Sequence, residues 1–332
     1  MTPTHSRRRN VLAALAAGSV AVLAACGSGS TQPADGGAGS SASSAAAGSK
    51  TIVFSPLGLQ IPAMKNLSEG VKGYGASKGY EVLVQDPGLN PTKQVTDLQS
   101  VIESGRAAGA WSIAVAPASM KDLVAKAQEK KVPIILNGVP ADYGLSGLVP
   151  GVSFSTIDYT AQGTAMGTEL GTCINEKLGG KAEVLFVESG PGTAGKQEQE
   201  TAVKAALTAT APGAKIVATT VVGDRAKSQT DIGNALQGNP GVKAVMGQND
   251  EGALGALGAF AAAGKELTCL TETGGNDEVL QAVKDGKIYA SVALQFGQDM
   301  TQSVDTLIAM IEDPTKTGVQ LTVPQKIIKA GS

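Results

Sequence analysis

From residue 50 onward, short runs of β-branched and apolar residues alternate with longer segments of helical periodicity. In the first half, the pattern predicts strands at 51–55, 80–85, 111–116 and 132–137 and helices at 62–78, 91–104 and 119–130. After Phe154 the same rhythm starts again, with helices at 163–178, 195–210, 230–236, 250–263 and 277–285 and strands at 182–188, 215–222, 242–247, 267–271 and 288–294. Continuous apolar strands that alternate with helices are typical of parallel sheets covered on both faces. The pattern therefore predicts an α/β fold with two Rossmann-like (flavodoxin-like) parallel-sheet domains.

The predicted architecture also indicates where a ligand would bind. In open α/β sheets, ligands collect at the carboxyl ends of the strands. Two such sheets that face each other would form a cleft, and a hinge motion would close it. We therefore expect a binding site between two lobes.

The first 25 residues are typical of an export signal. Three arginines at 7–9 precede an uncharged apolar run at 11–25, which is short for a membrane span. The run ends in Leu-Ala-Ala-Cys, which resembles the bacterial lipobox, whose cysteine becomes the lipidated first residue. We expect a signal peptide at 1–25 and a lipid on Cys26, in preference to a transmembrane anchor. Arg8 and Arg9 also resemble a twin-arginine signal, so Sec and twin-arginine export both stay open.

After the expected lipidation site, residues 27–49 are mostly Gly, Ser, Ala and Thr and have no hydrophobic period. Such a segment cannot bury enough apolar area to fold and behaves as a flexible tether. We therefore assign 26–49 to the lipidated cysteine and a flexible linker. This layout predicts an exported protein anchored at the outer face of the cytoplasmic membrane, in the cell envelope.

Composition narrows the chemistry of the exported part. The chain has 27 basic and 29 acidic residues, and without the three signal arginines 24 basic residues face the same 29 acidic ones. Because no basic stripe is present, a nucleic-acid partner is not expected. The single histidine, His5, lies in the signal, which excludes histidine-based catalysis and histidine-ligated metals from the mature chain. We expect no catalytic residue, no metal and no cofactor.

Two cysteines remain if Cys26 is lipidated. In an oxidising compartment Cys173 and Cys269 can form a disulfide, and two buried free thiols are the alternative.

The segment 247–256, Gly-Gln-Asn-Asp-Glu-Gly-Ala-Leu-Gly-Ala, ends a predicted strand and opens a helix of small residues. Asp250 can cap this helix through its side-chain oxygen. Together with Asn90-Pro91 and the segments 131–135 and 283–288, this sequence resembles the type I periplasmic binding proteins, especially the ribose and simple-sugar group. These are solute-binding proteins of ABC transporters.

The resemblance covers residues 50–329 and implies how the chain is divided. It implies three hinge crossings, near 155–158, 295–298 and 321–324. The N-terminal lobe would comprise 50–154 plus 297–321, and the C-terminal lobe 155–296 plus 322–332.

Most of the pentose contacts of the ribose group are absent from this chain. Met64 stands where an aromatic residue is expected, Asn137-Gly138 replaces an Asp-Arg pair, and Gln199 replaces an arginine. Neutral amides and hydroxyls dominate what remains, and these groups suit an uncharged polyhydroxy ligand. The candidate ligand-binding residues are Gln60, Met64, Asn137, Gln199, Asn249, Thr273, Gln295 and Phe296. For Asn249 the alternative is a turn residue that bonds local backbone.

Charged and aromatic residues near the expected cleft have competing interpretations. Arg225 is interpreted as a surface ion pair at a helix start. Glu188 and Glu272 lie at strand ends, where they are either solvated structural residues or partners of a cationic group. Trp111 is expected at the beginning of the third strand, in core or edge packing. Phe296 either packs against the ligand or has a structural role.

The resemblance implies an extracytoplasmic substrate-binding lipoprotein of an ABC importer, not an enzyme. It would bind a small neutral solute such as a sugar, polyol or cyclitol and deliver it to a membrane permease as a monomer. A sensory protein of the same fold and a binder of an amine or amino-acid-like solute are the alternatives. A LacI-like repressor shares the body, but here an export signal replaces the DNA-binding helices.

Overall fold

The computed structural model describes residues 50–331, and its strands form two six-stranded sheets. The expected signal peptide, Cys26 and nearly all of the expected linker lie outside the described residues. In the first sheet every strand pair is parallel and the order is β11-β5-β4-β3-β1-β2. Its strands are β1 (Thr51–Ser55), β2 (Glu81–Val84), β3 (Gly109–Ser112), β4 (Ile134–Asn137), β5 (Val152–Thr156) and β11 (Gln320–Thr322).

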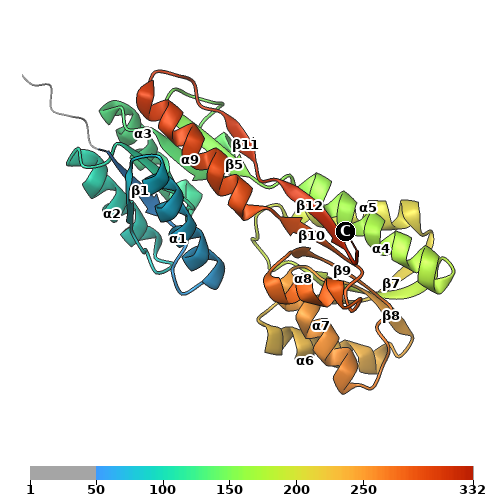
Figure 1. Cartoon of the computed structure of the whole chain (residues 1–332). Helices are drawn as coiled ribbons and strands as arrows, with labels where there is room; N and C mark the ends of the chain where they lie inside the picture. The colour runs from blue at the N-terminus through green and yellow to red at the C-terminus, as the bar shows by residue number, and fades with distance from the viewer. Residues whose placement is uncertain (1–49, 332) are drawn as a thin grey trace, which may run out of the picture. The chain divides into compact units, whose positions relative to one another are not determined.

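Helices cover both faces of the first sheet because its strands alternate apolar residues on both sides. On β1, Val53 belongs to the core cluster that includes α2 (Pro91–Glu103) and α3 (Lys121–Lys130). Its neighbours Ile52 and Phe54 belong to the cluster that includes α1 (Pro62–Ser77) and α9 (Phe296–Glu312). Figure 1 shows α9, from the C-terminal part of the chain, lying beside α1.

The second sheet repeats this arrangement with the order β12-β10-β9-β8-β6-β7, and only the β10–β12 pair is antiparallel. Its strands are β6 (Lys181–Glu188), β7 (Gly213–Val221), β8 (Val242–Met246), β9 (Cys269–Gly274), β10 (Ala290–Leu294) and β12 (Gln325–Lys329). One face packs against α4 (Tyr159–Leu178) and α5 (Lys196–Thr210). The other packs against α6 (Arg225–Gly238), α7 (Asp250–Ala262) and α8 (Asp277–Lys284). The two sheets confirm the predicted fold class.

Glycines bring α4 and α5 unusually close together. A Cβ atom at Gly163 would lie 2.2 Å from the carbonyl oxygen of Gln199, and one at Gly167 would lie 2.3 Å from that of Val203. These positions are four residues apart and therefore share one face of α4. The backbone of α5 occupies the space that side chains would need.

The chain passes between the sheets three times, after β5, after β10 and between β11 and β12. Backbone hydrogen bonds join these three connections: Val323 N–H donates to Thr156 O (2.8 Å), and Gln295 N–H donates to Pro324 O (2.8 Å). We propose that these connections are the hinge, with the lobe boundaries that the sequence predicts.

Some elements differ from the predicted ones. The third strand occupies 109–112 instead of 111–116, because side chains take over the backbone groups that follow it. Gln94 donates to Ile113 O (3.0 Å) and accepts from Val115 N–H (2.8 Å). The helix expected at 230–236 extends over 225–238, and β5, α9, β11 and β12 were not predicted.

Cys173 in α4 and Cys269 in β9 are joined by a disulfide, with 5.8 Å between their Cα atoms. The bond ties α4 to the second sheet. Within residues 50–331, no helix combines the length and the apolar character that crossing a bilayer requires.

Candidate functional site

A cavity of about 780 Å³ lies at the carboxyl ends of strands of the first sheet. Trp111 of β3, Asn137 of β4 and Ser155 of β5 contribute from that sheet. The start of α4 and the loop and first turn of α5 also line it. These segments belong to the second half of the fold, by which we mean the second sheet and the helices that cover it, as the first half is the first sheet and its helices. The cavity therefore draws on both halves, at the place where this type of sheet holds ligands.

Three of the predicted ligand-binding residues line the cavity: Met64 in the first turn of α1, Asn137 and Phe296. The Asn137 side chain is held in place, because its Oδ1 accepts from Ala114 N–H (2.6 Å) and from the hydroxyl of Tyr143 (3.2 Å). Its amide NH₂ group has no partner among the described residues and can donate to a ligand. Phe296 begins α9 and is 40% exposed.

Three other candidates do not line the cavity. Gln60 is exposed in the turn before α1, and the Gln295 amide donates to the nearby Ala293 O (3.2 Å). Asn249 accepts from Gly252 N–H (2.9 Å) and so caps α7. This contact corresponds to the alternative of local backbone bonding.

Gln199 and Thr273, the remaining candidates, belong to a buried chain of hydrogen bonds. Gln248 donates to Gln199, Gln199 donates to Gln162, and Gln162 donates to Thr273, each at 2.6 Å. The Thr273 hydroxyl donates in turn to Val292 O (2.9 Å). We call these four side chains the amide chain. Its members bond to one another and do not line the cavity.

Aromatic side chains form part of the cavity wall. Trp111 packs against Phe54 with 4.9 Å between ring centroids and is 2% exposed. Its expected core packing is confirmed, but its expected place at the beginning of the third strand is wrong. Because β3 is short and ends at Ser112, Trp111 lies near the carboxyl end and borders the cavity. Tyr159, which the sequence analysis missed, lies against Gly195, where a Cβ atom would be 2.1 Å from the ring.

Carboxylates are the second group that the sequence analysis missed. Asp142, Asp158, Glu198 and Asp299 line the cavity, and no Lys or Arg does. Asp299 is buried, and its Oδ1 accepts from the hydroxyl of Ser155 (2.7 Å) and the amide of Gln302 (2.9 Å). Asp158 caps α4. Asp158 is the last residue of a predicted hinge crossing and Tyr159 follows it, a position that could have revealed both.

Two of these carboxylates affect the pKa of the neighbouring Tyr159 hydroxyl. Burial raises the pKa of Tyr159, and the negative charges of Asp142 and Glu198 raise this pKa further. These two acids come from opposite halves of the fold, η2 (Pro140–Tyr143) after β4 and α5. The cavity wall is therefore electronegative from both sides.

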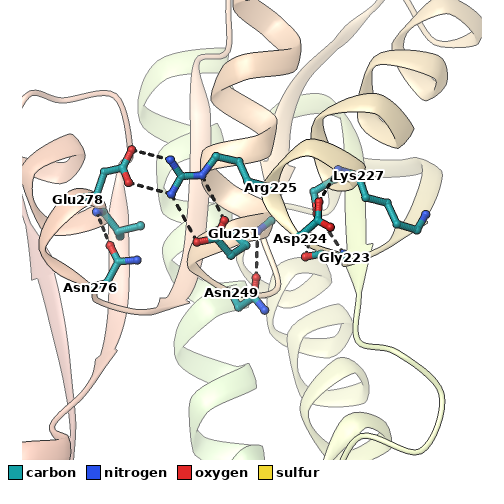
Figure 2. Close-up of polar contacts among 11 residues, drawn as sticks. Gly223, Asp224, Arg225, Lys227, Asn249, Glu251, Asn276 and Glu278 are labelled. Atoms are coloured by element: carbon teal, nitrogen blue, oxygen red, sulfur yellow. Dashed lines mark hydrogen bonds and ion pairs between the residues drawn. The ribbon is translucent and has the colours of Figure 1, made fainter. Parts of the chain in front are cut away.

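Arg225 does not line the cavity. Its guanidinium pairs with Glu251 (3.1 Å) and Glu278 (2.8 Å), so that one cation joins the first turns of α6, α7 and α8 (Figure 2). These contacts confirm the interpretation as a surface ion pair at a helix start.

Two expectations about carboxylates, one in α7 and one in β9, are wrong. Asp250 does not cap its own helix, because Asn249 occupies the cap position. Instead, the Oδ1 atom of Asp250 accepts from the N–H groups of Gly275 (2.8 Å) and Asn276 (3.0 Å). Glu272 is not a solvated residue: it is completely buried in β9, and burial together with the charge of Asp250 raises its pKa to about 8.

Glu188 is half-buried and lies 3.5 Å from Lys196 and 3.6 Å from Lys204, so its charge is paired within the protein. A metal centre has no support in residues 50–331, where no group of three His, Cys, Asp or Glu side chains is placed to hold an ion.

Two sheets of mainly parallel strands, three connections and a cavity at the strand ends define a solute-binding architecture. The sequence matches the family described as periplasmic binding protein domain over residues 52–315, and the chain belongs to this family. The ribose import binding protein RbsB of Bacillus subtilis is 28% identical over 270 residues, covering 78% of this chain and 81% of the relative. RbsB of Escherichia coli is 26% identical, covering 77% and 83%.

Solved structures show the same fold. A periplasmic solute-binding protein of an ABC transporter from Actinobacillus succinogenes, with bound D-allose, has a TM-score of 0.74 at 18% identity, covering 84% of this chain and 97% of that one. A Caulobacter myo-inositol binding protein has a TM-score of 0.70 at 22% identity, covering 85% and 94%.

Proposed function

We propose that this protein is the extracytoplasmic substrate-binding component of an ABC importer, and that it captures a small polyhydroxy solute such as a sugar, polyol or cyclitol. The observation that carries the proposal is the cavity at the strand ends, in which Asn137 offers a fixed amide donor beside exposed aromatic surface. Polar groups that fix orientation within a largely apolar wall are typical of small-molecule sites. The relatives are named as ribose import binding proteins.

Capture would work by a shift between conformations. Residues from both halves line the cavity, so a bound solute would contact both and favour a closed arrangement. The three hydrogen-bonded connections are the part of the chain where such a motion would occur. The solute would be released unchanged to a membrane permease, since no catalytic step is involved.

We further propose that Cys26 carries a lipid that holds the protein at the outer face of the membrane. The lipobox-like sequence before Cys26 supports this, as does the Gly/Ser-rich segment that separates it from the folded body. Labelling with a radioactive fatty acid in cells would test it, with Cys26→Ala as the control that should remain unlabelled.

A thermal-shift screen tests the proposed ligand class. Refolded, ligand-stripped protein would be heated with a panel of sugars, polyols, cyclitols and amino acids. A compound present at about 100 times its Kd should stabilise the protein by about 2.7 kcal/mol and raise the Tm. Responses confined to amino acids, with none from polyhydroxy compounds, would contradict the proposal.

A further inference from the structure

We infer that the cavity selects a polyhydroxy ligand that carries a protonated amine, such as an amino sugar or an aminocyclitol. This inference rests on the proposed function and names the chemical class within it. It departs from the neutral solute that the sequence suggested, because the residues that surround the cavity differ from those expected.

The first observation is an imbalance of charge at the wall. Asp142, Asp158, Glu198 and Asp299 line the cavity without a single Lys or Arg. Within residues 50–331, none of these four acids forms an ion pair. A cavity lined by charge of one sign concentrates ligands of the opposite sign. An anionic ligand is therefore disfavoured and a cation favoured.

The second observation is that the carboxylates retain free acceptor atoms. Local hydrogen bonds engage Oδ2 of Asp142 and Oδ1 of Asp158 and Asp299. The second oxygen of each has no hydrogen-bond partner among the described residues, and neither does the carboxylate of Glu198. An ammonium group offers three donors, and its hydrogen bonds to carboxylates are about twice as strong as bonds between neutral groups.

Asp299 is the strongest candidate for the ammonium partner. The residue is 6% exposed, yet it borders the cavity, so its charge is poorly solvated by bulk water. The hydroxyl of Ser155 and the amide of Gln302 orient it through Oδ1, which leaves Oδ2 available. A buried carboxylate without a cationic partner is costly, and a ligand cation would offset that cost.

The third observation is how the acids and the aromatic side chains are distributed around the cavity. The four acids come from η2, the start of α4, α5 and α9, and no three of the described carboxylates are close enough to share a metal ion. The spread of the acids over four elements favours an extended organic cation over a single metal ion. Aromatic surface from Tyr159 and Phe296 suits the apolar face of a sugar ring and also attracts a cation.

The test uses matched sets of ligands. Isothermal titration calorimetry at pH 7 would compare a neutral hexose, its 2-amino-2-deoxy derivative, the N-acetylated amine and the uronate, in the gluco, galacto and manno series. In at least one series the amine should bind about tenfold more tightly than the neutral hexose. N-acetylation, which removes the charge, should abolish the gain, and the uronate should not bind. Rising salt should weaken only the amine.

Variants distinguish a charge effect from a change of shape. Asp299→Asn and Glu198→Gln should each reduce the preference for the amine over the neutral hexose. Glu129→Gln, which removes an exposed acid of α3 outside the cavity, should leave the preference unchanged. Thermal unfolding of each unliganded variant would verify that it folds.

The possible failures can be told apart. If a neutral hexose binds as tightly as its amine, the charge inference is wrong and the proposed function stands. If neutral hexoses, amines and a wider set of polyols and cyclitols all fail to bind, the proposed function is wrong and the inference falls with it.

Discussion

The two sheets share one architecture but use the polar residues at their strand ends differently. In the first sheet, Asn137 ends β4 and Ser155 lies one residue before the end of β5, and both line the cavity. In the second, Gln248 follows β8 and Thr273 lies near the end of β9, and both are held in the amide chain. A polar residue at a strand end is therefore not by itself a ligand contact. The helices that pack over it decide whether its hydrogen bonds are already used.

The two halves also differ in how their helices pack against each other at glycine positions. In the first half, a Cβ atom at Gly70 of α1 would meet the flexible Met300 side chain of α9, at 2.8 Å from its sulfur. In the second half, a Cβ atom on α4 would meet the rigid backbone of α5. At these positions the α4–α5 contact is with fixed backbone, whereas the α1–α9 contact can adjust by moving a side chain.

The largest expected effect is on the pH dependence of stability. Because the pKa of Glu272 is raised to about 8 from 4.5, the folded state holds a proton that the unfolded state releases between these values. Stability should be highest below about pH 4.5 for this group and fall as pH rises to about 8, by on the order of 4 kcal/mol. Urea unfolding at several pH values would measure the slope.

Glu272→Gln isolates this contribution, because glutamine resembles the protonated acid. The variant should match the parent near pH 4 and exceed it in stability at pH 8. Equal pH slopes for the variant and the parent would show that Glu272 is ionised in the folded protein.

The next largest effect on stability is expected from a substitution at the contact between α4 and α5. Gly167→Ala places a methyl group against the Val203 carbonyl and should destabilise the protein by about 3 kcal/mol. Gly70→Ala is the matched change in the first half and should cost less, because the Met300 side chain can move. Thermal unfolding of the two variants would compare the halves, and equal losses would contradict the proposed difference.

Breaking the amide chain should have a smaller effect. Gln162→Leu removes the acceptor of Gln199 and a donor to Thr273, which leaves the buried Gln199 amide without an oxygen acceptor, at a cost of about 2 kcal/mol. Gln99→Leu, on the exposed surface of α2, is the control and should change stability by less than about 0.5 kcal/mol. Similar losses of stability in both variants would mean that the hydrogen bonds of the amide chain do not stabilise the protein more than an exposed glutamine does.

The smallest expected effect is an increase in stability from a substitution in α1. Gly73 lies on the exposed side of α1, and a Cβ atom there would meet nothing within 4 Å. Gly73→Ala should therefore stabilise the protein by about 0.8 kcal/mol through helix propensity alone. A loss in a chemical denaturation experiment would show that α1 does not tolerate a side chain at this position.

The fold class was predictable because alternation of strands and helices depends on local sequence. The boundary of β3 could not be predicted in this way. The strand ends because the side chain of Gln94, which lies in α2, bonds the backbone groups of Ile113 and Val115. The helix at 296–312 was not predicted either. Without α9, Asp299 could not be placed at the cavity.

The candidate site was predictable only in part. Met64, Asn137 and Phe296 were named from a family resemblance, and they line the cavity. Gln199 was named in the same way but lies in the amide chain, because Gln162 and Gln248 meet it from other elements. Which polar groups satisfy one another is a property of packing, and sequence spacing does not reveal it.

The central claim is that the solute binds in the cavity at the carboxyl ends of the first sheet. Trp111 is the only tryptophan of the chain and borders this cavity, so its fluorescence reports on the site directly. Titration of ligand-free protein with the polyhydroxy compound that gives the largest thermal shift should change Trp111 emission saturably, with the Kd found by calorimetry. Tight calorimetric binding with unchanged Trp111 emission would contradict the account.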